Sequence, residues 1–329
     1  MSIPNLRTSV NQTSTSLEYS IVASLCYFDH FDFPLTAFEV WHYLLLSPVR
    51  VALSEVLMAL DSSEFLKSYI ESESGMFFLK GRNEILKIRH QKYILAERKY
   101  RKALWATRLL VRLPYVRMVC IVNTLALSSA RDESDIDFFI VTQKKRVWLV
   151  RLLSTFLMQV LGKRPTAHST TDAICLSFFA SENALDLSPI QLEAKSEIPD
   201  LYMCYWLATA VPVYDEKKYY EEFYEKNVWV EHFLPNRIPV IPNQRRVVHI
   251  DRVSILIKKV FEALCGTWLE DVVYRFQLRF LPRYLKESMN HDTRVIVTED
   301  MIKFHPNDRR EEIRSNFTKK MYEIFGKSE

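Results

Sequence analysis

The chain has 329 residues, of which 48% are hydrophobic, and this content supports well-packed cores in two or three domains. Only five glycines and thirteen prolines are present, which excludes flexible linkers, collagen and low-complexity repeats. The formal net charge is +4, with the excess of Lys and Arg concentrated in residues 80–117 and after residue 237, where an anionic partner can bind.

Three further classes of protein or site are disfavoured. The longest apolar stretches, such as 147–161, include an arginine and fall short of the roughly 20 residues of a membrane span. Residues 1–16 are polar and lack the apolar core of a signal peptide. The five cysteines are scattered, without CxxC or Cys/His pairs at metal-ligand spacing. We therefore expect a soluble, cytoplasmic protein with buried reduced thiols, no membrane partner and no zinc site.

Residues 1–82 are predicted to contain three short helices followed by a hairpin. Helical periodicity runs over 17–29, and Thr36 and Ser54 are the expected N-caps of the second and third helices. Residues 67–80 are typical of two short strands joined by a turn. This order outlines a winged helix-turn-helix, and only analogy of fold connects it with DNA.

Residues 83–115 are predicted to form one long linking helix that Pro114 ends. From Lys80 to Arg117 there are twelve Lys or Arg against two acidic residues. Two interpretations stay open. The charges form a solvated face whose aliphatic stems cover apolar surface, or they contact phosphate or nucleic acid, because charge aligned on a helix tracks a polyanion.

Residues 116–216 are predicted to form a small mixed-sheet domain. Apolar runs favour three strands, at 116–122, 135–142 and 173–181. The helix expected at 147–161 is apolar almost all round, so it should pack on the sheet, and Gly162 is its C-cap. A buried helix and a short strand follow up to residue 215, and residues 217–329 are expected to be helical. The predicted fold class is therefore α+β.

Asp135 and Asp137 stand at alternate positions of the second of these strands. Successive strand side chains point to opposite faces, so both carboxylates leave the same face while Ile136 points to the other. Two such carboxylates are the hard oxygen ligands that suit Mg²⁺ bound together with phosphates. The pair indicates a metal site; the open alternative is that the two residues only cap the strand.

The residues upstream strengthen the metal interpretation. Asn123 and Thr124 end the preceding strand, and Thr124 stands eleven residues before Asp135. A short helix is expected over 125–131, with its N-terminal amides toward a phosphate. This arrangement resembles the polymerase-beta-like nucleotidyltransferase superfamily, in which the strand ends in Gly-Ser and Asp-x-Asp opens the next strand. The order of regions also resembles bacterial nucleotidyltransferase-domain proteins with a winged-helix-like N-terminal region and a helical C-terminal region.

The resemblance implies a nucleotidyltransferase-like domain over 116–216 that binds a nucleoside triphosphate (NTP) with Mg²⁺. It implies that Asp135 and Asp137 are catalytic and hold the metal. It also implies that the nucleotide is bound by Asn123 and Thr124, which stand in the Gly-Ser places, with Arg131 offsetting the charge of the triphosphate. From the residues alone, Thr124 is equally well explained as a helix N-cap, and an exposed Arg131 requires no ligand.

Two features depart from the family pattern. Glycine tolerates positive φ and lets a phosphate approach the backbone; Asn123 can adopt the same conformation, but its side chain takes up space. The family often has a third carboxylate on a later strand, and the interior of 173–181 has none. Asp172 and Glu182, at the two ends of that strand, are the nearest candidates.

Two other polar stretches have simpler explanations. Residues 144–146 are typical of a charged turn rather than a phosphate clamp. In the segment KFHPNDRR, residues 303–310, Asn307 or Asp308 as a helix cap accounts for the pattern.

Two functions are compatible with these patterns. The first is Mg²⁺-dependent NTP binding, with transfer of a nucleotide monophosphate to an acceptor hydroxyl. The second is a catalytically degenerate scaffold or nucleotide sensor that binds nucleic acid through its winged-helix-like region and basic helix. Sequence does not distinguish whether the protein pairs with itself or with another protein.

Overall fold

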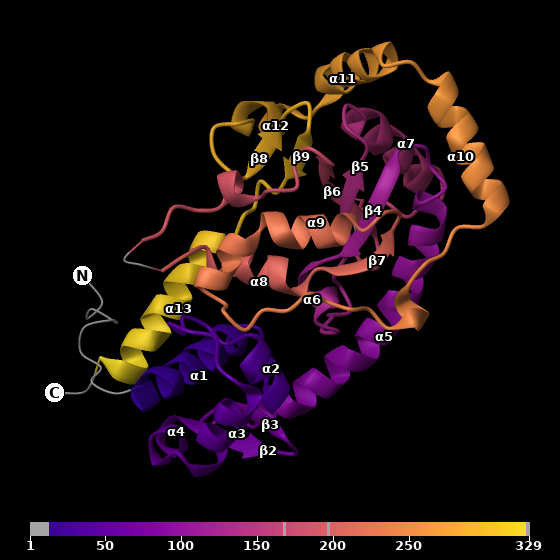
Figure 1. Ribbon diagram of the computed structural model, residues 1–329. Helices are drawn as coiled ribbons and strands as arrows, with labels where there is room; N and C mark the ends of the chain where they lie inside the picture. The colour runs from indigo at the N-terminus through magenta and orange to yellow at the C-terminus, as the bar shows by residue number, and fades with distance from the viewer. Residues whose placement is uncertain (1–12, 167–168, 196–197, 327–329) are drawn as a thin grey trace.

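The computed structural model describes residues 13–166, 169–195 and 198–326 and has a mixed α+β fold. The described residues contain thirteen α-helices and two β-sheets. Both sheets are visible in Figure 1, the smaller one beside α3 and the larger one beneath α7. None of the described helices is both long and apolar enough to cross a membrane.

The N-terminal region is built from short helices around a three-stranded antiparallel sheet of order β1-β3-β2. Its elements are α1 (Thr13–Asp29), β1 (Leu35–Thr36), α2 (Ala37–His42), α3 (Leu53–Ser62), α4 (Glu64–Tyr69), β2 (Ile70–Glu73) and β3 (Met76–Leu79). The predicted hairpin is confirmed, with Ser74 and Gly75 at positive φ in its turn. β1 and α4 were not predicted.

The caps of two helices test the sequence analysis locally. Thr36 caps α2 as predicted, in a capping box with Glu39. The prediction for Ser54 is wrong, because the N-cap of α3 is Ala52, two residues earlier. Glu55 accepts a hydrogen bond from the Ala52 amide at 2.6 Å, which is one half of a capping box. The other half is missing, because alanine has no hydroxyl to accept a hydrogen bond from the helix.

The predicted basic helix is α5 (Glu84–Leu110). In Figure 1 it runs from the small sheet to the large one and lies along both parts of the molecule. The buried apolar side chains in the second half of α5, from Ala96 to Leu110, belong to the core of the large sheet, so its apolar side is used as predicted.

The large sheet has six strands in the order β7-β4-β5-β6-β9-β8. Their bounds are β4 (Val116–Ile121), β5 (Ile136–Thr142), β6 (Ile174–Ser181), β7 (Val211–Asp215), β8 (Val295–Val297) and β9 (Met301–Phe304). β5 and β6 are parallel and are joined by α7 (Val147–Val160); the other neighbours are antiparallel. The three strands and the helix predicted for this region are confirmed, and Gly162 has positive φ after α7.

The region after residue 217 is not wholly helical, which corrects the prediction. Its helices are α9 (Tyr219–Lys226), α10 (Arg252–Leu264), α11 (Trp268–Phe280), α12 (Arg283–Ser288) and α13 (Arg310–Phe325). The preceding helix, α8 (Leu201–Thr209), lies before this region. The region after residue 217 also supplies β8 and β9, and β9 pairs with β6. The predicted boundary at residue 216 therefore does not separate a sheet domain from a helical one. Short 3₁₀ helices lie at Ser188–Ile190, Val228–His232 and Gln244–Arg246.

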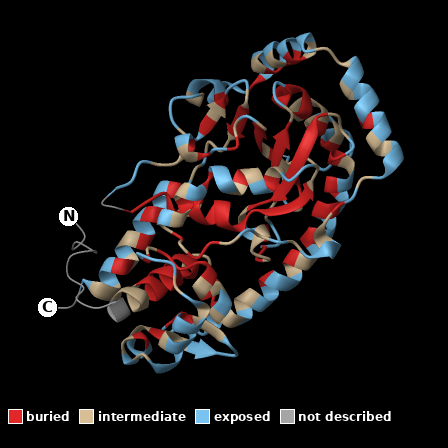
Figure 2. Cartoon of the chain, in the orientation of Figure 1, coloured by how far each residue is buried: buried red, intermediate tan, exposed pale blue. Residues whose placement is uncertain are grey.

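Two apolar layers cover the two faces of the large sheet. One face packs with α5, α7 and α11. The other packs with α8 and α9 and continues into α1 of the N-terminal region. α13 contacts both α1 and α8, and the buried residues in Figure 2 run through all of these elements. The second face is therefore enclosed by segments from both ends of the chain.

Candidate functional site

Asp135 and Asp137 lie at the amino end of β5, on the face of the sheet toward α8. In the parallel pairing of β5 with β6, Asp137 is opposite Cys175. One carboxylate oxygen of each aspartate and the Cys175 sulfur lie within 4.8 Å of one another. The structure brings the two predicted residues together and adds a thiol that the sequence analysis did not connect with them.

The two aspartates line a cavity of about 480 Å³. Asn123 and Thr124 line the same cavity, next to the aspartates, because β4 ends beside the start of β5. α8 contributes Tyr202, Met203 and Trp206, and the segment from β9 into α13 contributes Lys303, His305, Asn307, Asp308, Arg309 and Arg310. A volume of this size is within the range of small-molecule sites.

Asn123 connects three elements at the cavity. Its φ is +60°, in the left-handed region that the resemblance requires of the Gly position. Its side-chain oxygen accepts a hydrogen bond from the Tyr202 hydroxyl at 2.8 Å, and its side chain is near enough to Asp137 to act to lower the pKa of that carboxyl. Asn123 therefore keeps the positive φ and lies against a carboxylate, and it is part of the cavity wall.

The conformation of Asn123 leads to a prediction about two substitutions. Asn123→Ala and Asn123→Gly both remove the side-chain hydrogen bonds, but only alanine pays for the left-handed backbone, by roughly 1–2 kcal/mol. We expect the glycine variant to be the more stable of the two in urea denaturation. Position 126, in the helical turn α6 (Asn123–Ala126), should show the opposite preference. There Ala126→Gly should make the protein less stable. Equal stability of the two Asn123 variants would contradict the assigned backbone role.

The aspartate pair is electrostatically strained. Burial raises the pKa of Asp137 to about 6, and the charge of Asp135 acts in the same direction. Burial also raises the pKa of Asp135, although Cys175, Lys99 and Arg164 act to lower it. Two carboxylates this close favour the gain of a proton or a cation.

We expect Asp137→Asn to raise the free energy of unfolding by about 1 kcal/mol at pH 8. The pKa of Asp137 in the folded protein, about 6, lies above the unfolded value of about 3.9. The folded state therefore binds more protons in this window, and wild-type stability falls as the pH rises through it. In urea denaturation from pH 4 to 8, the free energy of unfolding of the variant minus that of wild type should increase with pH up to about pH 6–7. The same substitution at exposed Asp132 should show no such growth, and a constant difference for Asp137→Asn would rule out this explanation.

The two candidates for a third carboxylate point elsewhere. Asp172 forms ion pairs with Lys99, at 3.0 Å, and with Lys102. Burial acts to raise the pKa of Asp172, but hydrogen bonds from these lysines hold it below its ordinary value. Glu182 accepts hydrogen bonds from the Tyr219 hydroxyl and the Lys144 amide. Neither belongs to the cluster of Asp135 and Asp137.

Arg131 and Thr124 have different surroundings. Arg131 is exposed and is not among the residues that line the cavity, so the structure does not place it where the resemblance implies. Thr124 lines the cavity and is exposed to it. The helix expected over 125–131 is only the single turn α6, which begins at Asn123.

Part of the charge of α5 is used inside the molecule, whereas Lys87, Arg101 and Arg108 are exposed. Lys99 is fully buried and donates hydrogen bonds to the carbonyls of Asp132, at 3.0 Å, and Ser134, at 2.7 Å. Arg89 pairs with Glu39 at 2.7 Å, and Arg98 pairs with Asp132. Lys99 thus anchors the loop that leads into Asp135, a role that sequence analysis missed.

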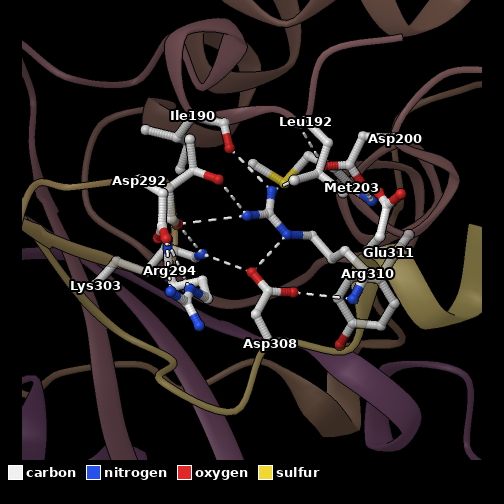
Figure 3. A network of polar contacts seen from close by, with 12 residues as sticks. Ile190, Leu192, Asp200, Met203, Asp292, Arg294, Lys303, Asp308, Arg310 and Glu311 are labelled. Atoms are coloured by element: carbon white, nitrogen blue, oxygen red, sulfur yellow. Dashed lines mark hydrogen bonds and ion pairs between the residues drawn. The ribbon is translucent and has the colours of Figure 1, made fainter. Parts of the chain in front are cut away.

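A buried ionic network holds the segment after β9 in place (Figure 3). The Arg310 guanidinium pairs with Asp200 and with Asp308, each at 2.7 Å, and donates to the Ile190 carbonyl at 2.9 Å. Lys303 lies 3.6 Å from Asp308. Burial lowers the pKa of Lys303 to about 8, with Arg310 acting in the same direction, so its amine is still mostly protonated at pH 7.

The segment 303–310 was explained too simply from sequence. The prediction that Asn307 or Asp308 caps the helix is wrong, because the N-cap of α13 is Arg309, although Asp308 accepts a hydrogen bond from the Arg310 amide at 2.9 Å. The same segment also lines the cavity, and His305 lies 3.1 Å from the Ser177 hydroxyl. Ser177 in turn accepts a hydrogen bond from Cys175 at 3.3 Å. The polar positions Cys175 and Ser177 within an otherwise apolar strand are the sequence signal that was available.

Comparisons with family models, with curated proteins and with solved structures gave no match to this chain. The functional conclusions therefore rest on the cavity and its residues.

Proposed function

We propose that the protein binds an NTP together with Mg²⁺ in the cavity at the amino ends of β5 and β6. The observation that carries the proposal is the composition of one cavity of about 480 Å³. It combines a carboxylate pair, cationic side chains and aromatic rings. These are the groups that a metal ion, a triphosphate and a base require.

The donor set of the aspartate pair fits Mg²⁺. Asp135 and Asp137 offer hard oxygen ligands, and the cavity has room for the water and phosphate oxygens that Mg²⁺ keeps around it. When bound, the ion neutralises phosphate charge and relieves the repulsion between the two carboxylates. Asn123 lies beside Asp137 and acts to lower its pKa, and Lys99 anchors the loop before Asp135.

The other walls of the cavity suit the rest of a nucleotide. Lys303 in β9 and Arg309 just before α13 supply positive charge. Tyr202 and Trp206 present rings on which a base can stack. A smaller cavity of about 50 Å³ shares Phe31, Tyr202 and Trp206 with the larger one and adds Tyr27 and Phe33. Its apolar lining extends the aromatic side of the site.

Transfer of a nucleotide to an acceptor hydroxyl is the activity that the resemblance to polymerase-beta-like nucleotidyltransferases implies. In that reaction the hydroxyl oxygen bonds to the α-phosphorus as pyrophosphate leaves, and a base takes the hydroxyl proton. Where the family often has a third carboxylate, β6 has Cys175 and Ser177. We therefore propose NTP binding as the primary function, and transfer stays a prediction that release of pyrophosphate can test.

Binding is tested by calorimetry and thermal shift with each of the four NTPs, with and without Mg²⁺. We expect binding that requires Mg²⁺ and that weakens at least about 100-fold in Asp135→Asn and Asp137→Asn, since each removes a charged ligand. Asp132→Asn, an exposed acid of the same loop, is the matched control and should bind like wild type. Undiminished binding in the Asp135→Asn/Asp137→Asn double variant would refute the proposed site.

We also propose that the N-terminal region is winged-helix-like, from the order of its helices and its β1-β3-β2 sheet. A function of that region in binding nucleic acid is less well supported. The exposed face of α3 carries Leu57 and Met58, 47% and 69% exposed, beside the acidic Glu55, and the β2–β3 hairpin carries Glu71 and Glu73. Acidic surface repels a polyanion, so binding of nucleic acid is not part of the proposal.

A further inference from the structure

The cluster of Asp135, Asp137 and Cys175 differs chemically from a pure carboxylate site. Magnesium prefers oxygen ligands and gains little from a thiol. Zn²⁺ and other thiophilic divalent ions bind thiolate and carboxylate together, usually in a tetrahedron. The thiol of Cys175 is therefore the feature that the proposed Mg²⁺–NTP function leaves unexplained.

We propose that Asp135, Asp137 and Cys175 form a three-ligand site for a thiophilic divalent cation such as Zn²⁺. The competition described below rests on the proposed nucleotide function, whereas binding of the cation does not. Binding exchanges the Cys175 S–H bond for a metal–sulfur bond, and the proton passes to solvent.

The distances between the three side chains fit this site. Zn–S bonds of about 2.3 Å and Zn–O bonds of about 2.0–2.2 Å place the ligand atoms of a tetrahedron roughly 3.5 Å apart. The three ligand atoms here lie within 4.8 Å of one another. Because Asp137 and Cys175 are paired across neighbouring strands, small side-chain rotations close the remaining distance.

The surroundings support the three ligands and leave one position open. Asn123, held by a hydrogen bond from Tyr202, lies beside Asp137 and acts to lower its pKa, and Cys175 donates a hydrogen bond to Ser177 at 3.3 Å. Hydrogen bonds of this kind orient metal ligands and raise affinity. Both aspartates line the cavity, so the fourth position faces space that water or a ligand can fill.

The site has a consequence for the nucleotide. Asp135 and Asp137 serve both the thiophilic ion and the Mg²⁺–NTP complex, so the two cannot be bound fully at once. Zinc binds a mixed N/O/S site more strongly than magnesium does. We therefore expect Zn²⁺ to inhibit binding of Mg²⁺–NTP, and Cys175→Ser to relieve this inhibition while leaving Mg²⁺–NTP binding within about 3-fold of wild type.

The test uses Cd²⁺ added to the metal-free full-length protein, without nucleotide. A cadmium–thiolate charge-transfer band in the ultraviolet, which Zn²⁺ competes away, is expected for wild type and not for Cys175→Ser. Cys265→Ser is the matched control, because Cys265 is the other described cysteine that is only partly buried, and it should keep the band. Asp137→Asn keeps the thiol and should weaken Cd²⁺ affinity at least about 100-fold.

The outcomes separate this inference from the proposed function. A wild-type protein without the band, a band that survives Cys175→Ser in a folded variant, or one lost in Cys265→Ser overturns the thiophilic site. If Cys175→Ser does not fold, Asp137→Asn becomes the deciding variant. Cd²⁺ affinity in Asp137→Asn equal to that of wild type then also overturns the thiophilic site. A cadmium–thiolate band without Mg²⁺–NTP binding supports the thiophilic site and refutes the nucleotide function. Mg²⁺–NTP binding without the band supports the nucleotide function and refutes the thiophilic site.

Discussion

Arg310→Met is expected to lower the free energy of unfolding by about 3–5 kcal/mol, the usual effect of removing one partner of a buried ion pair. The Arg310 side chain is 4% exposed and that of its partner Asp200 is 1% exposed, so the substitution leaves a buried carboxylate without its cation. Asp308 and the Ile190 carbonyl lose hydrogen bonds as well. Urea denaturation followed by circular dichroism measures the loss.

The neighbouring Arg309 offers a matched control. Its side chain is 64% exposed and pairs at the surface with Glu312 three residues along α13. Exposed pairs of this kind contribute little, so Arg309→Met should stay within about 0.5 kcal/mol of wild type. Similar losses in the two variants would show that the network of Figure 3 does not hold the segment in place.

The contrast between these two arginines also bears on the nucleotide. Arg310 has its guanidinium occupied by two carboxylates, so its role is to fix the cavity wall. Arg309 is at the rim and can exchange Glu312 for a phosphate. We therefore attribute direct charge contacts to Arg309, and the shape of the cavity wall to Arg310 and to Lys303, whose buried amine donates to the Thr293 carbonyl and lies 3.6 Å from Asp308.

The elements that the sequence predicted best are those with a strong local pattern. The apolar runs of β4, β5 and β6, the periodicity of α5 and the Thr36 capping box all depend on residues close together in the chain. β8 and β9 are three and four residues long, and they are strands because β9 pairs with β6, more than 100 residues earlier. No local pattern contains that pairing.

The candidate site shows the same division. Asp135 and Asp137 were predictable because alternation along one strand puts both on one face. Cys175 joins them through the register of a neighbouring strand, and Lys303 and His305 through the placement of the C-terminal segment. The positive φ of Asn123 could be anticipated only because asparagine is one of the few residues that tolerate it.

The basic stretch of α5 shows why charge counts mislead without packing. Read along the sequence, its lysines and arginines resemble a surface for a polyanion. In the structure, Lys99 is buried under the loop that precedes Asp135, and Arg89, Arg98 and Lys102 each have an acidic partner. Pairs of opposite charge that are distant in sequence cancel part of the excess, while Lys87, Arg101 and Arg108 stay exposed.

Lys99→Met is expected to lower the free energy of unfolding by about 3 kcal/mol. The Lys99 side chain is 0% exposed, and its amine binds the Asp132 and Ser134 carbonyls and the Asp172 carboxylate. Methionine fills similar volume but satisfies none of these acceptors, so the loss measures the polar contacts rather than a cavity. Because Ser134 directly precedes Asp135, Mg²⁺-dependent nucleotide binding should also weaken under conditions where the variant is folded.

Lys102→Met separates this anchoring role from the charge balance of Asp172. Lys102 pairs with the same carboxylate but is 45% exposed, so its removal should change the free energy of unfolding by no more than about 0.5 kcal/mol. Both variants lose one positive charge from α5. If the two variants destabilise the protein equally, the loss of one positive charge explains the effect and the anchoring explanation fails. If only Lys99→Met destabilises it, the basic helix α5 is a structural support for the carboxylate pair.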